Sequence, residues 1–469
     1  MTEAQTSGAD STHYDLIVIG AGCAGFVTAI RAHSLGLKTL LIEKMDRPAG
    51  NTTFATGFLL GINTKLQEGK GLPQDSVEDY CTDMMAVSKQ KASPQLTRYV
   101  AEHCNEAIEW LHDFVGVKFA TGMKLIWPVL TRGHLVVGEH FPGGRQLAHS
   151  LWEKAKAIGL PIAFNTKVLK LLEDEATGGV CGCRIKDEEG CRTLKSKYGV
   201  VLATGGFSAN QALVTTYMGS GAAKMPLRGS STITGDNLRF SDPFFAKFVN
   251  MDQYHCGPIY SKTGENPLFI ANNGVIVNAD GERYTDEGQT YVQIARDTGA
   301  KTAMNQGYII CDQTIREKPA LQIHFKEYVD TGAPLYTGET LEEAARQAGL
   351  NVANVVATVE GYNAAIEKYQ GATLTPPNTL TNPPRLLTPP YSIVPFEAGM
   401  TATFGGPLIN TQAQVLDTEG RSIDGLFAVG NAAGGLFYDD YGGGGQLTSA
   451  TVFGLACAAY VKEQKEQTP

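Results

Sequence analysis

The sequence lacks the features that mark a membrane or secreted protein. No apolar run approaches the roughly 18 residues that a transmembrane helix needs. The opening stretch, MTEAQTSGADSTHYD, has neither a basic cluster nor an apolar core, so it is not typical of a signal peptide. We therefore expect no membrane span and a cytoplasmic location.

Basic clusters and metal-binding cysteine patterns are also missing. The 39 Lys and Arg residues are outnumbered by 48 Asp and Glu residues, giving a net charge of −9, and they form no run. This argues against nucleic-acid binding. Cys181, Cys183 and Cys191 lie close together, but no Cys or His follows them at zinc spacing. The nine cysteines show no paired spacing, which predicts reduced thiols and no metal site.

Glycine, by contrast, is abundant. It supplies 53 of 469 residues, and these are clustered rather than periodic. Such clusters are typical of backbone that approaches a ligand closely. Hydrophobic residues make up 43% and charged residues 19%, as in a folded globular protein. The length predicts two domains, or one large domain with an insertion.

The first glycine cluster lies in a strand–turn–helix pattern. A β-branched apolar run over Asp15–Ile19 leads into Gly20-Ala21-Gly22-Cys23-Ala24-Gly25 and then a helical stretch through Ala32. A second apolar run, Lys38–Ile42, ends at Glu43. Strand, glycines, helix, strand and acid occur in the order that binds a dinucleotide.

Each part of this pattern has a physical role. Gly20 allows the tight turn, Gly22 lets a pyrophosphate approach the backbone, and Gly25 lets helix and strand pack closely. The amides at the helix start face the phosphates. Glu43 stands where an acid accepts the ribose hydroxyls, and its charge would repel the 2′-phosphate of NADP. The segment therefore predicts a dinucleotide site that disfavours NADP.

Further ordered motifs follow along the chain. A polar loop of small residues covers Pro48–Gly57, and two more strands enter glycine turns at Gly199–Phe207 and Gly425–Gly435. The last cluster, Tyr441–Ser449, precedes a predicted helix over Ala450–Lys462, for which Thr448 or Ser449 is the expected cap.

Together these motifs resemble the flavoprotein family of fumarate reductase and succinate dehydrogenase flavoprotein subunits, tricarballylate dehydrogenases and 3-ketosteroid dehydrogenases. The resemblance extends from about Tyr14 to Tyr460. It implies an α/β fold with a discontinuous Rossmann-like FAD-binding domain, residues 14–254 and 398–469. An α+β capping domain, residues 255–397, would be inserted in it, and a disordered tail, 1–13, would precede it. Within the insertion we expect helices at Leu341–Ala348 and Ala353–Tyr369.

The resemblance also implies how FAD is held. Val168 would meet the adenine through its backbone, and relatives usually carry Glu where this chain has Asn431. Some relatives attach the flavin to a His, but none lies between His33 and His103, so we expect non-covalent FAD. The implied cofactor-binding residues are Gly20, Gly22, Cys23, Ala24, Gly25, Glu43, Lys44, Asn51, Thr52, Thr53, Gly57, Val168, Ala203, Thr204, Gly205, Asp236, Gly430, Asn431, Gln446, Leu447 and Thr448.

At the positions that bind substrate, the chain departs from the fumarate reductases. Those enzymes carry His, Arg and Arg where this sequence has Ala402, Tyr441 and Tyr291. The arrangement is similar to that of the 3-ketosteroid dehydrogenases, in which one Tyr follows an Asn-Glu pair by four residues and another precedes a glycine by four. Here Tyr291 follows Glu287 by four, and Tyr441 precedes Gly445 by four.

This similarity implies a mechanism. The Tyr441 hydroxyl and the Gly445 amide would donate to a substrate carbonyl and stabilise the developing enolate. Tyr291 would exchange a proton with the α-carbon while a hydride moves between the β-carbon and flavin N5. A phenol needs a lowered pKa for this role, so we expect a polar or cationic neighbour. His255 is a further candidate proton donor, or a structural histidine.

We therefore expect an FAD-dependent oxidoreductase, either a dehydrogenase or an ene-reductase, acting on a C–C or C=C bond next to a carbonyl. Its partners would be a small-molecule carbonyl substrate and an unidentified electron donor or acceptor, since the chain has no second dinucleotide motif. One alternative is a tricarballylate-type dehydrogenase or reductase of small polycarboxylates. Gly435–Tyr438 resembles that group, and Arg296 would suit an acidic substrate. Another is a flavin-binding subunit without turnover. Asp439 and Asp440 have no assigned role.

Overall fold

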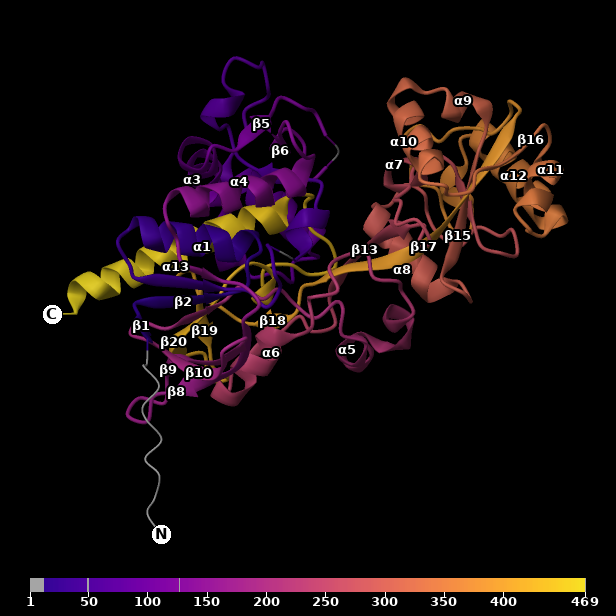
Figure 1. Ribbon diagram of the computed structural model, residues 1–469. Coiled ribbons are helices and arrows are strands. Elements are labelled where there is room, and N and C mark those ends of the chain that lie inside the picture. The colour runs from indigo at the N-terminus through magenta and orange to yellow at the C-terminus, as the bar shows by residue number, and fades with distance from the viewer. Residues whose placement is uncertain (1–11, 49, 126, 469) are drawn as a thin grey trace, which may run out of the picture. The chain divides into compact units, whose positions relative to one another are not determined.

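The computed structural model describes residues 12–48, 50–125 and 127–468 (Figure 1). The chain forms two compact units, and each consists of segments that are far apart in the sequence. Unit 1 comprises Met1–Leu213, Gly229–Tyr254 and Ala402–Pro469. Unit 2 comprises Val214–Arg228 and His255–Thr401.

The unit boundaries differ from the expected domain boundaries at two segments, of which residues 398–401 are the shorter: they belong to unit 2 rather than to the second part of the expected FAD-binding domain. Residues 214–228 belong to unit 2, whereas the sequence analysis placed them in the FAD-binding domain. The backbone gives the reason. Arg228 N–H donates to the Met400 carbonyl over 2.7 Å, and Met400 N–H donates to the Pro226 carbonyl over 2.9 Å. The segment therefore pairs with strand β17 (Tyr391–Thr403), which lies almost entirely in unit 2.

A six-stranded sheet forms the centre of unit 1. Its order is β19-β20-β11-β2-β3-β7, and all neighbours are parallel except β19 with β20. Strands β2, β3 and β11 are buried along their whole length, which explains their nearly continuous apolar sequences. The expected α/β, Rossmann-like fold is confirmed. The bounds are β2 Leu16–Ile19, β3 Thr39–Ile42, β7 Ile162–Ala163, β11 Val200–Leu202, β19 Gln414–Leu416 and β20 Ser422–Ala428.

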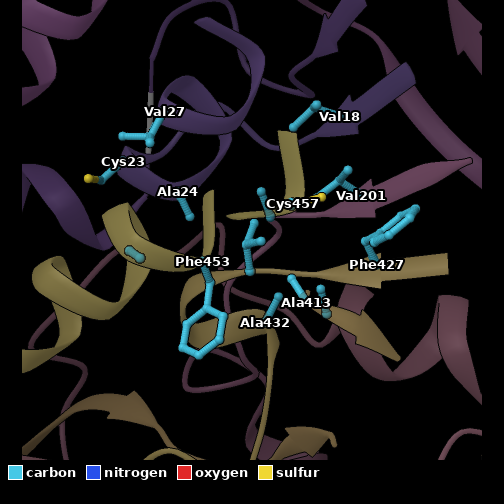
Figure 2. Packing of buried hydrophobic residues seen from close by; sticks show 14 of the residues in the cluster. Val18, Cys23, Ala24, Val27, Val201, Ala413, Phe427, Ala432, Phe453 and Cys457 are labelled. Carbon is cyan, nitrogen blue, oxygen red and sulfur yellow. The ribbon is translucent and has the colours of Figure 1, made fainter. Parts of the chain in front are cut away.

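Two helices from opposite ends of the chain, α1 (Cys23–Ser34) and α13 (Gly445–Gln467), pack against each other in unit 1 (Figure 1). They approach closely because Gly454 has no side chain. A Cβ there would lie 3.0 Å from both Val27 Cγ1 and Thr28 Oγ1. Figure 2 shows part of the core that results, in which side chains of β2, β11 and α13 gather in one cluster.

Smaller elements complete unit 1. One sheet has the order β1-β10-β9-β8, another β4-β6-β5, and β12 pairs with β18. Of the expected tail, residues 1–11 lie outside the described residues, while Thr12 and His13 form part of β1. The bounds are β1 Thr12–Tyr14, β4 Phe58–Leu60, β5 Lys118–Ala120, β6 Gly133–Val137, β8 Lys167–Glu173, β9 Val180–Asp187, β10 Gly190–Ser196, β12 Phe248–Val249, β18 Gly406–Pro407, α2 Val77–Val87, α3 Pro94–Trp110, α4 Gly143–Ala157 and α6 Asp236–Ser241.

Unit 2 is built on a mainly antiparallel sheet of order β13-β17-β15-β14, with β16 also paired to β17. It has its own apolar core. The two helices expected from the sequence are confirmed as α11 and α12. The bounds are β13 Tyr254–Ile259, β14 Val275–Val277, β15 Gln306–Cys311, β16 Tyr336–Gly338, α7 Leu268–Ala271, α8 Tyr291–Lys301, α9 Gln313–Arg316, α10 Pro319–Asp330, α11 Leu341–Gln347 and α12 Val352–Glu367.

Two features are absent from the described part of the chain. None of its helices combines the length and apolarity needed to cross a lipid bilayer. In the same residues, no group of three or more His, Cys, Asp or Glu side chains is arranged to hold a metal ion.

Candidate active site

The turn between β2 and α1 is closely packed at two glycines. Gly20 has φ +106°, and a Cβ there would lie 2.5 Å from the Ala203 carbonyl oxygen. A Cβ on Gly25 would lie 1.8 Å from the Gly20 carbonyl oxygen. Gly22 is the N-cap of α1 and has no side chain of its own to cap the helix. The turn thus tolerates no side chain at Gly20 or Gly25, and Gly22 places none at the start of the helix, where backbone amides can face a ligand.

Residues from two other segments meet this turn. The Cys23 amide donates to Thr52 Oγ1 over 2.9 Å, and the Ala21 amide donates to Glu43 Oε2 over 2.8 Å. Cys23 and Ala24 begin α1, and burial raises the pKa of the Cys23 thiol to about 12. A neutral thiol adds no negative charge beside a bound phosphate.

Glu43 is buried at the end of β3. Its Oε1 accepts a hydrogen bond of 2.9 Å from the Met45 amide, while Oε2 accepts from Ala21. A carboxylate has about four acceptor positions, so two contacts leave capacity for ribose hydroxyls. The two backbone contacts fix the orientation of the carboxylate.

An ion-pair chain connects the residues expected at the adenosine end. Lys44 Nζ lies 3.0 Å from Asp236 Oδ2, and Arg239 Nη2 lies 2.8 Å from Asp236 Oδ1. Burial alone would raise the pKa of Asp236, but Lys44 and Arg239 outweigh it and lower the pKa. Arg239 also donates to the carbonyls of Leu169 (2.8 Å) and Val168 (3.3 Å). The backbone of Val168, which is expected to meet the adenine, therefore already uses its carbonyl as a hydrogen-bond acceptor.

The loop that carries Asn51, Thr52, Thr53 and Gly57 is fixed by backbone contacts. Asn51 Oδ1 accepts from the Ser230 amide over 2.8 Å, and Thr53 Oγ1 donates to the Gly50 carbonyl over 3.1 Å. Gly57 has φ +89°, and a Cβ there would lie 2.5 Å from Cα of Gly143, the first residue of α4.

Two more turns follow the parallel strands β11 and β20. Ala203, Thr204 and Gly205 come directly after β11, and Gly205 has φ +69°. Gly430 follows β20 with φ +60°, and a Cβ there would lie 2.9 Å from Ala24 Cβ. The carboxyl ends of β2, β11 and β20 thus meet, which is where doubly wound sheets bind ligands.

Helix α13 starts earlier than expected. Its first residue is Gly445 rather than Ala450, and Gly444 is the N-cap with φ 102° and no side-chain cap. Thr448 is therefore not a cap, because it lies within the first turn. There its hydroxyl donates to the Gly444 carbonyl (3.1 Å) and accepts from the Leu60 amide (2.7 Å). Leu447 is half-buried against the core of unit 1.

Gln446 joins this helix to the turn after β20. Its Oε1 accepts a hydrogen bond of 3.0 Å from Asn431 Nδ2. Its Nε2 is buried and has no hydrogen-bond partner among the described residues. A buried amide N–H normally donates to an acceptor, so Gln446 Nε2 is suited to donate a hydrogen bond to an acceptor atom of a bound ligand.

Tyr441 lies in an aromatic cluster in unit 1. Its ring centroid is 5.9 Å from that of Phe404 and 5.6 Å from that of Phe437, and these two are 5.5 Å apart. The Tyr441 amide donates to Asp440 Oδ1 over 2.8 Å. Asp439, in a left-handed conformation (φ 62°), pairs with Lys89 at 2.8 Å and donates its amide to Gln253 Oε1 at 3.0 Å. The two aspartates without an assigned role therefore shape the turn that carries Tyr441.

The Gly445 amide already has an acceptor within the glycine turn. It donates to the Gly442 carbonyl over 2.8 Å. A donor that is used within the glycine turn is not available to a substrate carbonyl in this conformation. This hydrogen bond is not predictable from the sequence, because the carbonyl of any of the consecutive glycines could accept it.

Unit 2 brings Tyr291 and His255 together. Tyr291 is the first residue of α8, His255 lies on β13, and Tyr291 Oη is 3.4 Å from His255 Nε2. Burial, and then the positive charges of Arg228 and Arg296, lower the pKa of His255 well below 6.5. His255 is therefore a neutral imidazole near pH 7.

Arg228 supplies the cationic neighbour expected for Tyr291. A Cβ placed on Gly257 would lie 2.9 Å from Arg228 Nη1 and 3.4 Å from Tyr291 Cε2. Arg228 Nη1 also donates to Thr401 Oγ1 over 2.8 Å. The sequence analysis missed Arg228, which lies 63 positions before Tyr291 and has no local pattern linking it to that residue.

The glycine turns, the glycine N-caps of α1 and α13 and the buried Gln446 amide fit the phosphates and polar ring edge of a flavin dinucleotide. Fold and site thus define a dinucleotide-binding α/β protein. The comparison with known families identifies it further: residues 15–447 match the family model described as FAD binding domain, and the chain belongs to this family.

Curated relatives of this chain are reductases and dehydrogenases. A probable fumarate reductase, Ifc3, of Shewanella frigidimarina (strain NCIMB 400) is 27% identical over 451 residues, covering 94% of this chain and 73% of the relative. The urocanate reductase of Eggerthella lenta is 27% identical and covers 96% of this chain and 74% of the relative. A 3-oxosteroid 1-dehydrogenase of Mycobacterium tuberculosis is 23% identical, with 96% and 98% covered.

The fold is also that of solved flavoenzymes. The structure of 3-ketosteroid Δ1-dehydrogenase from Sterolibacterium denitrificans superposes with a TM-score of 0.81 and covers 97% of this chain and 100% of that one, at 21% identity. The resemblance noted in the sequence is therefore confirmed at the level of the family. The chain is a flavin-dependent oxidoreductase that acts on CH–CH groups.

Proposed function

We propose that this oxidoreductase acts on the carbon–carbon bond next to a carbonyl group of a small molecule, and that the Tyr441 hydroxyl polarises that carbonyl. The observation that carries the proposal is the setting of Tyr441. The Phe404 and Phe437 rings and the Asp440 carboxylate hold it four residues before the first residue of α13. A donor fixed in this way stabilises negative charge on an oxygen without reorganisation.

Within this proposal, Gly445 has a conditional role. The Gly445 amide can donate to the substrate carbonyl beside Tyr441 only if it gives up its present hydrogen bond to the Gly442 carbonyl. Tyr441 is therefore the main donor, and replacing it is the sharper test.

Proton transfer is assigned to Tyr291. Arg228 and Tyr291 both lie beside Gly257, while neutral His255, 3.4 Å from the Tyr291 hydroxyl, can accept or return a proton. His255 is a positioning residue and proton relay in this account, since it contacts Tyr291. When bound, FAD supplies a two-electron carrier that exchanges hydride at N5.

The FAD is proposed to be non-covalent, because the sequence has no His between His33 and His103. Glu43, Lys44 and Asp236 would hold the adenosine end, while the start of α1 and the Thr52 hydroxyl beside it would hold the phosphates. Gln446 and Asn431 would lie at the flavin. Electrons would pass to or from a separate donor or acceptor.

The alternative, a dehydrogenase or reductase of small polycarboxylates, is favoured by one observation. Arg228 and Arg296 both place positive charge at His255, and Arg residues are the preferred partners of carboxylates. The fumarate and urocanate reductases among the relatives also have acidic substrates by name.

A screen of oxidants separates the two functions. The purified protein is photoreduced without oxygen, and the return of its flavin absorbance is followed after addition of enones or of fumarate and aconitate. Rapid reoxidation by enones supports the proposal. Reoxidation by the polycarboxylates alone supports the alternative, and a protein that takes up no FAD contradicts both.

A further inference from the structure

A turn formed by residues 250–253 of unit 1 follows strand β12. The Gln253 amide donates to the Asn250 carbonyl over 3.0 Å and closes the turn, and Asn250 is left-handed with φ 56°. Because β12 pairs with β18, the turn lies against the segment that leads into β18. A Cβ on Gly405, which directly precedes β18, would lie 2.6 Å from Met251 Cα, so backbone meets backbone there. The spacing of the two segments is therefore fixed by close packing.

Gln253 joins two segments that hold Tyr441. Its side-chain Oε1 accepts a hydrogen bond of 3.0 Å from the amide of Asp439, which precedes Tyr441 by two residues. Its backbone carbonyl accepts a hydrogen bond of 2.9 Å from the Phe404 amide, and the Phe404 ring packs against Tyr441. Gln253 is 6% exposed, so water is poorly placed to replace it as the acceptor of these amides.

Asn250 holds the other aromatic neighbour of Tyr441. Its Nδ2 donates to the Phe437 carbonyl over 2.9 Å, and the Phe437 ring centroid lies 5.6 Å from that of Tyr441. Asn is one of the few residues that adopt the left-handed conformation readily, which suits it to the start of this turn. The turn thus binds the backbone of both rings that pack on Tyr441.

An exposed contact also reaches the segment before Tyr441, but it should contribute less. Lys89 Nζ lies 2.8 Å from the Asp439 carboxylate, and the Lys89 side chain is 60% exposed. Exposed ion pairs contribute little, whereas removing a buried acceptor is costly because its donor has already lost contact with water. The contact expected to fix the Asp439 backbone is therefore the one with Gln253.

We propose that Gln253 is a positioning residue for the reaction, which fixes Tyr441 through Asp439 and Phe404 so that the Tyr441 hydroxyl meets the substrate carbonyl. Gln253 itself touches no reacting atom in this account. A displaced donor stabilises the developing negative charge less well, so the loss should appear in the chemical step and not in flavin binding. The inference rests on the proposed function, because it takes Tyr441 as the carbonyl donor.

A double-mutant cycle tests this role. Gln253→Met removes the side-chain acceptor at similar length and leaves the backbone carbonyl in place. Lys89→Met removes the exposed ion pair of the same segment and is the matched control. Both are made in the wild type and in Tyr441→Phe. The kcat and KM for an enone, the rate constant of flavin reoxidation, the flavin content and the melting temperature are measured.

Gln253→Met should lower kcat and the reoxidation rate constant by about 10-fold, with KM within about three-fold and the flavin content unchanged. Lys89→Met should stay within about two-fold of the wild type. In Tyr441→Phe, Gln253→Met should cause no further loss beyond about two-fold, because the hydroxyl that it positions is absent. If Gln253→Met fails to fold, Gln253→Asn gives the same test, because its shorter side chain withdraws the acceptor from the Asp439 amide.

The outcomes separate this role from general damage and from the proposed function. If Gln253→Met slows the reaction equally with and without the Tyr441 hydroxyl, its effect does not pass through Tyr441 and the inference is overturned. A wild-type rate in Gln253→Met overturns it as well, and leaves the proposed function standing if Tyr441→Phe is slow. If Tyr441→Phe itself reacts at the wild-type rate, the proposed function fails and the inference with it.

Discussion

The Ala21 amide donates a 2.8 Å hydrogen bond to the carboxylate of Glu43, which lies 22 positions further along the chain. This bond joins the middle of the glycine turn to the end of the next parallel strand. Since Met45 binds the other carboxylate oxygen, two backbone donors fix an acid at the point where ribose hydroxyls are expected.

Replacing Glu43 by Gln should weaken FAD binding by about 10-fold or more. The Gln side-chain NH₂ group would face the amide of Ala21 or Met45, so two donors would meet, and the negative charge of the carboxylate would be lost. Fluorescence titration of the apoprotein with FAD measures the Kd. Glu68→Gln is the control, since Glu68 is exposed. Equal Kd values for the two variants would contradict the assignment.

The close contact at Gly25 predicts a severe effect of a single methyl group. In Gly25→Ala the new Cβ would meet the Gly20 carbonyl oxygen, so the turn must shift, and we expect loss of bound flavin and a lower melting temperature. In Gly361→Ala, within α12, the Cβ meets nothing within 4 Å, and the helix should be slightly stabilised. Flavin absorbance per protein and thermal unfolding measure both. A Gly25→Ala protein with a full complement of flavin would show that the turn can accommodate a methyl group at Gly25, against this prediction.

Tyr291→Phe should reduce turnover by about 100-fold while leaving the flavin content unchanged, because the proton-transferring hydroxyl is lost but no cofactor contact is. Tyr369→Phe is the control, since Tyr369 is 98% exposed. Steady-state kcat with an enone is the measurement. If Tyr291→Phe had the wild-type kcat over the whole pH range, Tyr291 would not be the proton-transferring residue.

His134 predicts acid sensitivity of the fold. Its Nδ1 donates to the Arg132 carbonyl at 2.8 Å, its Nε2 accepts from Thr64 Oγ1 at 2.6 Å, and burial lowers its pKa to about 4. Between pH 6.5 and about 4 the unfolded chain takes up a proton that the folded protein does not. The free energy of unfolding should therefore fall with falling pH, by up to about 1.4 kcal/mol per pH unit.

Urea unfolding between pH 7 and 4.5 measures this slope. His134→Asn keeps a donor toward the Arg132 carbonyl and should make the slope shallower, whereas His103→Asn, at a partly exposed histidine, should not change it. Buried His255, with its pKa lowered in the same direction, should keep part of the slope in both variants. Equal slopes for the two variants would mean that His134 is not the group that titrates.

The sequence was sufficient for features set by local pattern. The glycines of the β2–α1 turn, Glu43 and helix α12 follow from spacing, and the fold follows from their order. The contacts of Arg239 with Val168 and of Arg228 near Tyr291 were not predictable, since they join residues 71 and 63 positions apart without a local signature.

The start of α13 was misplaced for a different reason. The sequence predicts a turn of four consecutive glycines that ends before the helix, with Thr448 or Ser449 as the cap. In the structure Gly444 takes the left-handed cap position, and Gly445 already belongs to the helix. Glycine allows both conformations, so the sequence does not distinguish them, and in the structure the Phe58 backbone lies 3.0 Å from where a Cβ on Gly444 would stand.

The central claim is that the Tyr441 hydroxyl polarises a substrate carbonyl, and one measurement tests it most directly. The flavin is reduced anaerobically, and its reoxidation by an enone is followed by stopped flow in the wild type, in Tyr441→Phe and in Tyr438→Phe, whose hydroxyl lies 3.1 Å from Lys91. The account predicts a rate constant lowered about 100-fold or more in Tyr441→Phe alone. Equal rate constants for Tyr441→Phe and the wild type would contradict it.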